Sequence, residues 1–152
     1  MIGLLQRVAS AAVTVGGKEV GAIGRGILAY LGVEKADDRD IADRLLERLL
    51  GYRVFSDAEG KMNLSVRDVK GGVLLVPQFT LVADTAKGMR PSFSSGASPE
   101  YGREMFDYLA AQARARHGEV ACGVFGAEMQ VASINDGPVT FWLHVAPRRL
   151  LA

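Results

Sequence analysis

The sequence feature that most restricts the fold is the Gly137-Pro138 pair, which stands between two apolar runs. Residues 129–134 precede this motif and residues 141–145 follow it, and both runs are rich in the β-branched and aromatic residues typical of strands. Because proline has no backbone N–H and a fixed φ, a strand ladder must turn or stop here. Glycine has no Cβ and an X-Pro bond can be cis, so residues 135–140 are either an ordinary connecting turn or a rigid peptide wall facing a ligand.

Other apolar runs predict further strands. Gly16-Gly17 separates two of them and is a two-residue turn typical of a β-hairpin. Residues 27–33 and 73–76 are apolar throughout, as expected for central or buried strands. Residues 119–126 are expected to form one more strand, which leads into the run before the Gly-Pro pair.

Two segments have the apolar spacing of amphipathic helices. The first begins after Asp37 or Asp38, either of which can cap it. The second begins with Ser98 and Pro99, a capping hydroxyl followed by a proline at the first helical position, and Gly118 ends it. Its predicted inner stripe consists of Tyr101, Met105, Tyr108, Leu109 and Gln112, with Phe106 beside it.

The composition favours one globular domain. Of the 152 residues, 49% are apolar and 23% are charged, which is enough for a domain with its own core. Many strands together with two amphipathic helices predict an α+β domain that spans residues 1–152. The formal net charge is +1, so the chain as a whole has no field that would attract nucleic acid.

Cysteine content and the N-terminal sequence bear on location. The single cysteine, Cys122, excludes an internal disulfide framework and a multi-cysteine metal site, and it favours a reducing compartment. The first residues lack the basic region and apolar stretch of a signal peptide, and no apolar run is long enough to span a bilayer. We therefore expect a cytoplasmic protein that does not bind a membrane.

A proline in an unusual place marks a candidate binding site. Pro77 directly follows the apolar run 73–76, and a proline does not fit a central strand unless the ladder ends there. We therefore expect residues 77–80 to keep some backbone groups unpaired and available to a ligand. The loop that follows contains Lys87 and Arg90, which are either solvated side chains or a small anion site for a phosphate.

Familiar catalytic sets are scarce. His117, near a helix end, is interpreted as a surface residue, and His144, in an alternating strand, as a structural one. Thr80 could act as a nucleophile, but a threonine needs a nearby base and the sequence indicates none. No metal-ligand spacing or glycine-rich nucleotide motif is present. An enzyme with this sequence would depend on backbone donors and on groups of its own substrate.

Two motifs carry a resemblance to a known family. Residues 77–81 (PQFTL) and 135–140 (NDGPVT) resemble the two signature motifs of the D-aminoacyl-tRNA deacylases. Four further matches occur in the family's order over essentially the whole chain. They are Gln6-Arg7-Val8, Gly60-Lys61-Met62-Asn63, Lys87-Gly88 with Arg90-Pro91-Ser92-Phe93, and Phe125-Gly126-Ala127-Glu128-Met129.

The resemblance implies a barrel-like α+β fold, a homodimer, and hydrolysis of the ester that joins a D-amino acid to the 3′-terminal adenosine of a tRNA. It implies that Gly137-Pro138 is cis and enters the active site of the partner subunit, where it selects chirality. It further implies that Gln78, Phe79 and Thr80 line the pocket, with backbone N–H groups directed at the ester carbonyl and the adenosine. No metal or organic cofactor is implied, and neither a membrane nor DNA is an expected partner. The remaining substrate-binding residues are expected to be Lys87, Arg90, Phe93, Met129 and Asn135.

The proposed wall would select by exclusion. A rigid peptide near Cα of the substrate would leave room for a substituent on one side only. Glycine has no side chain to exclude, so the same filter predicts cleavage of glycyl-tRNA and sparing of L-alanyl-tRNA. The near-neutral net charge of the chain is compatible with a tRNA substrate, because only the CCA end of the tRNA need be held.

The sequence departs from the family pattern at two positions. Pro77 stands where the family usually has serine, which removes a hydroxyl and one N–H. Ser133 stands where a large aliphatic residue is usual, which would leave a packing defect if this side chain faced the core.

Two other classes of function are compatible with the residues. One is a non-catalytic module that binds an RNA end or a nucleotide by stacking on Phe79 or Phe93. The other is a structural homodimer in which the Gly-Pro loop is only an interlock. Hydrolysis of a D-aminoacyl ester distinguishes an enzyme from the first class, and loss of the dimer without loss of any ligand would favour the second.

Overall fold

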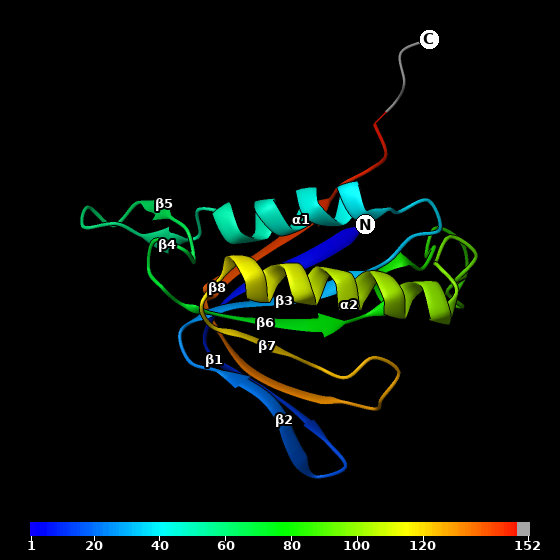
Figure 1. Ribbon diagram of the computed structural model, residues 1–152, viewed down its shortest axis with the longest axis horizontal. Helices are drawn as coiled ribbons and strands as arrows, with labels where there is room; N and C mark the ends of the chain where they lie inside the picture. Colours follow the sequence, from blue (N-terminus) through cyan, green and yellow to red (C-terminus); the bar gives the residue numbers. More distant parts are fainter. Residues whose placement is uncertain (149–152) are drawn as a thin grey trace.

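The computed structural model describes residues 1–148, which form two helices and a large mixed sheet (Figure 1). This arrangement confirms the predicted α+β class. In chain order the elements are β1 (Ile2–Val15), β2 (Lys18–Ile23), β3 (Gly26–Gly32), α1 (Arg39–Gly51), β4 (Phe55–Ser56), β5 (Met62–Leu64), β6 (Gly72–Pro77), the 3₁₀ turn η1 (Phe79–Val82), α2 (Pro99–Arg116), β7 (Val120–Cys122) and β8 (Gln130–His144).

The sheet is organised around the long strand β1. It pairs antiparallel with β8 along one edge and with β3 and then β2 along the other, whereas β6 lies parallel to β3 and to β7. The sheet curls until β2 approaches β7, where a Cβ placed on Gly21 would be 2.8 Å from the carbonyl oxygen of Cys122. The result is a nearly closed, barrel-like sheet, and α1 and α2 lie side by side over one face of it (Figure 1).

Local sequence signals explain how the strands and helices begin. Gly16 and Gly17 both have positive φ, as the tight turn of the β1–β2 hairpin requires. Asp38 caps α1, because its Oδ1 accepts a hydrogen bond from the Ile41 N–H at 2.9 Å. Ser98 caps α2 in the same way, with Pro99 as the first helical residue.

Burial of α2 differs in part from the predicted stripe. Met105 and Leu109 are buried as expected, and Phe106 is also buried instead of standing beside the stripe. Tyr108 and Gln112 are only half-buried. The remaining buried positions of α2 are small residues: Gly102, Ala110 and Ala113.

The predicted turn at residues 135–140 is wrong, because the Gly-Pro pair lies inside the single strand β8. Both halves of β8 pair with β1: Asn135 lies opposite Val8 and Thr140 opposite Gln6. One residue of β1, Arg7, therefore faces four of β8, and these residues 136–139 bulge out of the ladder. The missing N–H of proline interrupts the pairing, but β1 continues on both sides and keeps the direction of the strand.

The structure also bears on the predicted strand at residues 119–126, on Ser133 and on membrane-spanning segments. Residues 119–126 form a strand only at Val120–Cys122. Ser133 is exposed and pairs with Ala11, so it causes no packing defect in the core. Neither helix of the described residues has the length and apolar character needed to cross a membrane.

Candidate active site

The first part of the candidate site is the carboxyl end of β6. Pro77 pairs with Leu31 of β3, and the Gln78 N–H then donates to the Leu31 carbonyl oxygen at 2.8 Å. The expectation that the Gln78 N–H is available to a ligand is therefore wrong. The Phe79 and Thr80 N–H groups, by contrast, have no hydrogen-bond acceptor within residues 1–148. Two adjacent backbone donors are thus open to a ligand at the start of η1.

The side chains at this strand end interact with each other and are accessible to a ligand. The Gln78 Nε2 donates a hydrogen bond to Thr80 Oγ1, which fixes the threonine hydroxyl. In the part of the chain that the structure describes, no carboxylate or imidazole bonds this hydroxyl. Thr80 and the Phe79 ring are exposed, the latter by 66%.

The loop after η1 adds an aromatic ring and two cations. Phe93 lies against Phe79, with ring centroids 5.3 Å apart, so the structure brings these two predicted residues together. Paired backbone hydrogen bonds between Asp84 and Ser92, of 2.7 and 3.0 Å, close the base of this loop. Lys87 and Arg90 are exposed near its tip, and neither forms an ion pair with another described residue.

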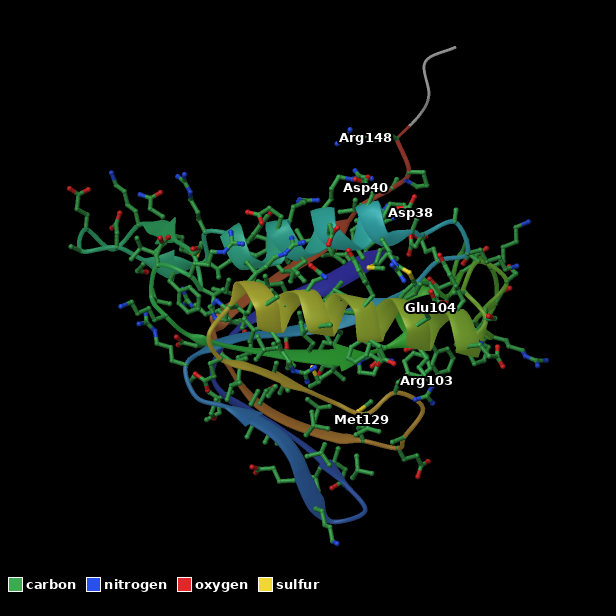
Figure 2. All side chains as sticks on the ribbon, in the orientation of Figure 1. Asp38, Asp40, Arg103, Glu104, Met129 and Arg148 are labelled. Atoms are coloured by element: carbon green, nitrogen blue, oxygen red, sulfur yellow. The ribbon has the colours of Figure 1, made fainter. Side chains whose placement is uncertain are left out.

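Met129 lies close to the same strand end. Its Sδ accepts a hydrogen bond from the Val124 N–H at 3.4 Å and would be 2.7 Å from a Cβ placed on Gly123. That same Cβ position is 3.4 Å from Pro77 Cδ, so Met129 packs near the residue that precedes Gln78. Met129 is the last residue of the connection between β7 and β8, and it is labelled in Figure 2.

The second part of the candidate site is the β8 bulge. The Gly137-Pro138 peptide bond is cis. Asn135 braces the bulge from within, since its Oδ1 accepts from the Val139 N–H at 3.2 Å and its Nδ2 donates to Thr140 Oγ1 at 2.9 Å. The predicted residue Asn135 therefore shapes the bulge.

Arg7 holds the bulge from β1 and was not identified as a site residue from the sequence. Its Nε donates to the Asp136 carbonyl oxygen at 3.0 Å, and its Nη1 donates to the Val54 carbonyl oxygen at 2.8 Å. A Cβ on Gly137 would be 3.0 Å from Arg7 Nη2 and 2.7 Å from Val139 Cγ2, and Gly137 has a φ of +131°. This position therefore requires glycine. The only sequence signal was the Gln6-Arg7-Val8 match to the family.

The two parts of the candidate site lie far apart within one chain. The bulge begins beside Val8, which is aligned through the intervening strand β3 with the start of β6. Gln78 follows the other end of β6 (Figure 1). Five residues of strand span about 16 Å, and the three steps from β8 across β1 and β3 to β6 span about 14 Å. Roughly 20 Å therefore separates the Gly-Pro pair from the free donors of the same chain.

Neither histidine lies at the two parts of the site. His144 Nε2 is 2.8 Å from Glu34 Oε2, which also accepts a 3.0 Å hydrogen bond from the N-terminal ammonium. Partial burial opposes ionisation of Glu34, but these two hydrogen bonds outweigh it and lower the pKa of the carboxyl. His117 Nε2 is 2.6 Å from the Gly71 carbonyl oxygen. Within residues 1–148, no three His, Cys, Asp or Glu side chains are grouped so as to hold a metal ion.

Solved structures define the fold class. One, titled "Structural Analysis of a probable eukaryotic D-amino acid tRNA deacylase", matches with a TM-score of 0.80 over 93% of this chain and 97% of that one. Its 18% identity makes this a likeness of fold alone. Another, titled "c-Myc DNA Unwinding Element Binding Protein", has a TM-score of 0.92 and 38% identity over 97% of this chain and 100% of that one. The fold is therefore that of the deacylase-like α+β proteins.

Sequence comparison then gives the family. The family model for D-Tyr-tRNA(Tyr) deacylase matches residues 4–144. A D-aminoacyl-tRNA deacylase from Pseudomonas putida (strain F1) is 61% identical over 145 residues, covering 95% of this chain and all of the relative. One from Thioalkalivibrio sulfidiphilus is 60% identical over 149 residues, 98% of this chain and all of the relative. The chain belongs to the D-Tyr-tRNA(Tyr) deacylase family. Its activity is that of a D-aminoacyl-tRNA deacylase, an ester hydrolase that binds tRNA, and the assignment made from the two motifs is confirmed.

Proposed function

We propose that the deacylase is a homodimer whose active site is shared between subunits, with residues 78–80 of one chain receiving the Gly137-Pro138 bulge of the other. The observation that carries this proposal is the strand register, which places the bulge beside the start of β6 and residues 78–80 beyond its end, roughly 20 Å apart by generic strand spacing. Both parts are exposed, so a second copy can bring them together without refolding.

The exposed surface of β8 supports the same arrangement. Within residues 1–148, β8 is an edge strand that pairs only with β1, and its Ile134 and Trp142 side chains are 61% and 57% exposed on either side of the bulge. Large apolar side chains on an open strand edge favour association with another chain. A contact along this edge would carry the bulge toward the partner.

The free backbone donors supply the chemistry. An aminoacyl ester is already activated and carries a neighbouring ribose hydroxyl, so the enzyme must mainly orient water and stabilise the oxyanion that forms. The Phe79 and Thr80 N–H groups are the donors for this oxyanion, while the Gln78 amide orients the Thr80 hydroxyl. No strong side-chain base is needed.

The remaining predicted residues have roles in holding the substrate. Phe79 and Phe93, whose rings lie tilted against each other, offer aromatic surface on which the terminal adenine can stack, since base–aromatic stacking does not require a particular base. Lys87 and Arg90 lie on the same loop as Phe93 and would contact phosphate. Met129 packs at the wall of this pocket, and Asn135 sets the shape of the partner's bulge.

Chiral selection in this arrangement is steric. The partner's Gly137-Pro138 peptide would lie against the substrate Cα and exclude a substituent on the L side. It would not exclude glycine, so glycyl-tRNA is also a substrate.

Disruption of the β8 edge tests the shared site. Trp142→Glu should convert the dimer into monomers and abolish hydrolysis of D-tyrosyl-tRNA, because an exposed side chain can be changed without loss of the monomer fold. Analytical ultracentrifugation and a deacylation assay measure the two effects. Val20→Glu is the matched control, since Val20 is also an exposed strand residue, at 42%, but lies on β2. A fully active monomer of Trp142→Glu would contradict the proposal.

Replacement of the threonine hydroxyl tests the backbone mechanism. Thr80→Ala keeps the N–H donor and should retain activity within about tenfold of wild type, the cost of losing one oriented hydrogen bond. Single-turnover hydrolysis of D-tyrosyl-tRNA measures this, with circular dichroism as the check on folding. A folded but inactive variant, together with an acyl-enzyme trapped on the wild type, would instead identify Thr80 as a nucleophile.

A further inference from the structure

A groove outside the two parts of the active site lies between α2 and the segment after β7. Its volume is about 370 Å³. Figure 2 shows Arg103 directed from α2 toward the connection between β7 and β8. The lining of the groove includes Arg103, Asp107, Arg114, Cys122, Gly123 and Phe125.

Two guanidinium groups in this groove are free to bind an anion. Arg103 lies over the Phe125 ring at 5.0 Å, and its Nη2 donates to the Phe125 carbonyl oxygen at 3.4 Å. Arg114 Nη2 donates to Cys122 Sγ at 3.3 Å, and no other described residue accepts a hydrogen bond from the Arg114 side chain. Among the described residues neither arginine has a carboxylate within ion-pair distance. Both cations therefore keep most of their donors for a ligand.

The groove is continuous with the end of β6. Gly123 lines the groove, and its N–H donates to the Leu75 carbonyl oxygen at 2.8 Å. A Cβ placed on Gly123 would lie 3.4 Å from Pro77 Cδ, so the groove starts next to the residue that precedes Gln78. A nucleotide chain whose last adenosine binds at residues 78–80 has this groove beside it.

We propose that this groove binds the two cytidines that precede the terminal adenosine of the tRNA. The proposal rests on the active site assigned above to residues 78–80. Arg103 and Arg114 provide phosphate contacts, and the Phe125 ring with the guanidinium plane above it provides a surface on which a base stacks. Asp107 lies between the two arginines along α2 and accepts a hydrogen bond from the exocyclic amine of cytosine.

The carboxylate argues for a nucleotide and against a simple anion. A phosphate alone would be repelled by Asp107, whereas a cytidylate presents both an anion for the arginines and an amine donor for the aspartate. The three charged side chains thus match three different features of one nucleotide unit. They are exposed, so their replacement should not affect folding.

The test compares two substrates that share the terminal adenosine. D-Tyrosyl-adenosine occupies only residues 78–80, whereas the trinucleotide ester D-tyrosyl-CCA also reaches the groove. For Arg103→Ala and for Arg114→Ala, the ratio of kcat/KM for D-tyrosyl-CCA to that for D-tyrosyl-adenosine should fall about tenfold, the cost of one charge-assisted hydrogen bond. Arg44→Ala, which changes a half-buried arginine of α1 paired with Asp40, should keep the wild-type ratio.

A second comparison tests Asp107. In the wild type, replacement of both cytidines by uridines should lower kcat/KM about tenfold, because uracil lacks the amine donor. Asp107→Ala should no longer distinguish the two trinucleotides. Thermal unfolding of each variant checks that the fold is retained.

Other outcomes would overturn the assignment. A wild-type ratio in both arginine variants, or equal loss in Arg44→Ala, would mean that the cytidines leave the active site elsewhere. A loss seen only with full-length tRNA would mean that the groove contacts the acceptor stem. Phe79→Pro, which removes one of the proposed oxyanion donors, separates these results from a failure of the active-site assignment. If this variant hydrolysed D-tyrosyl-adenosine normally, residues 78–80 would not be the active site.

Discussion

Mixing two inactive variants should restore deacylation, provided that each active site takes its two parts from different chains. Phe79→Pro removes a donor N–H that the protein itself does not use, and loss of one oxyanion donor costs about 10²–10³ in rate. Pro138→Trp places a large side chain where the partner's substrate would bind. Each homodimer should be inactive, and an equal mixture should reach about a quarter of wild-type activity, because half of the dimers are mixed and each has one intact site.

The design separates a shared site from a site within one chain. If both parts served the same chain, each subunit of a mixed dimer would carry one defect and no activity would return. Differently tagged chains and native mass spectrometry verify that exchange has occurred. Each variant incubated with an excess of itself is the control. Absence of recovery after verified exchange would contradict the shared site.

The backbone at Gln78 is tolerant of this change. Gln78 has φ −141° and ψ 82°, which is outside the α region that a following proline disfavours, and the Phe79 N–H has no acceptor within residues 1–148. A loss of activity in Phe79→Pro therefore reflects the loss of the donor and the ring. Phe79→Ala, which removes the ring but keeps the N–H, distinguishes these two contributions.

Local chemistry made several elements predictable from the sequence. The hairpin at Gly16-Gly17 and the caps at Asp38 and Ser98 depend on residues within one turn of each other. The end of the β6 ladder near Pro77 follows from the missing N–H of proline. Each of these signals is complete within a few residues, so no knowledge of the rest of the chain is needed.

Strand register decided what the sequence did not reveal. The missing N–H of Pro138 is compatible with a turn and with a bulge, because it interrupts the strand ladder in both. The pairing of β8 with β1 on both sides of the proline shows that the structure is a bulge. The Gln78 N–H is occupied because β3 and β6 align in parallel with Leu31 opposite Pro77. Arg7 reaches the bulge across 129 positions of sequence. The sequence around such a residue does not indicate which distant residue it will contact.

A large effect is also expected for an achiral substrate, glycyl-tRNA. Glycyl-tRNA should be hydrolysed within about tenfold of the rate for D-alanyl-tRNA, since loss of one methyl contact is worth only about 1–3 kcal/mol. L-Alanyl-tRNA should be spared by a much larger factor. Glycine and L-alanine differ by a single methyl group, so the comparison isolates the steric contribution of the wall. Single-turnover hydrolysis of the three esters at equal enzyme concentration measures it.

A change in the wall itself distinguishes exclusion from recognition of the D side chain. Under exclusion, Pro138→Ala removes ring atoms beside the substrate Cα and should admit L-alanyl-tRNA, while hydrolysis of glycyl-tRNA changes little. Under recognition, the pocket grips the D side chain directly, and glycyl-tRNA should be spared as completely as L-alanyl-tRNA in the wild type. The two mechanisms therefore predict opposite results for glycyl-tRNA. Because glycine presents only hydrogen on either side of Cα, a wild-type enzyme that spared it could not be selecting by a steric wall.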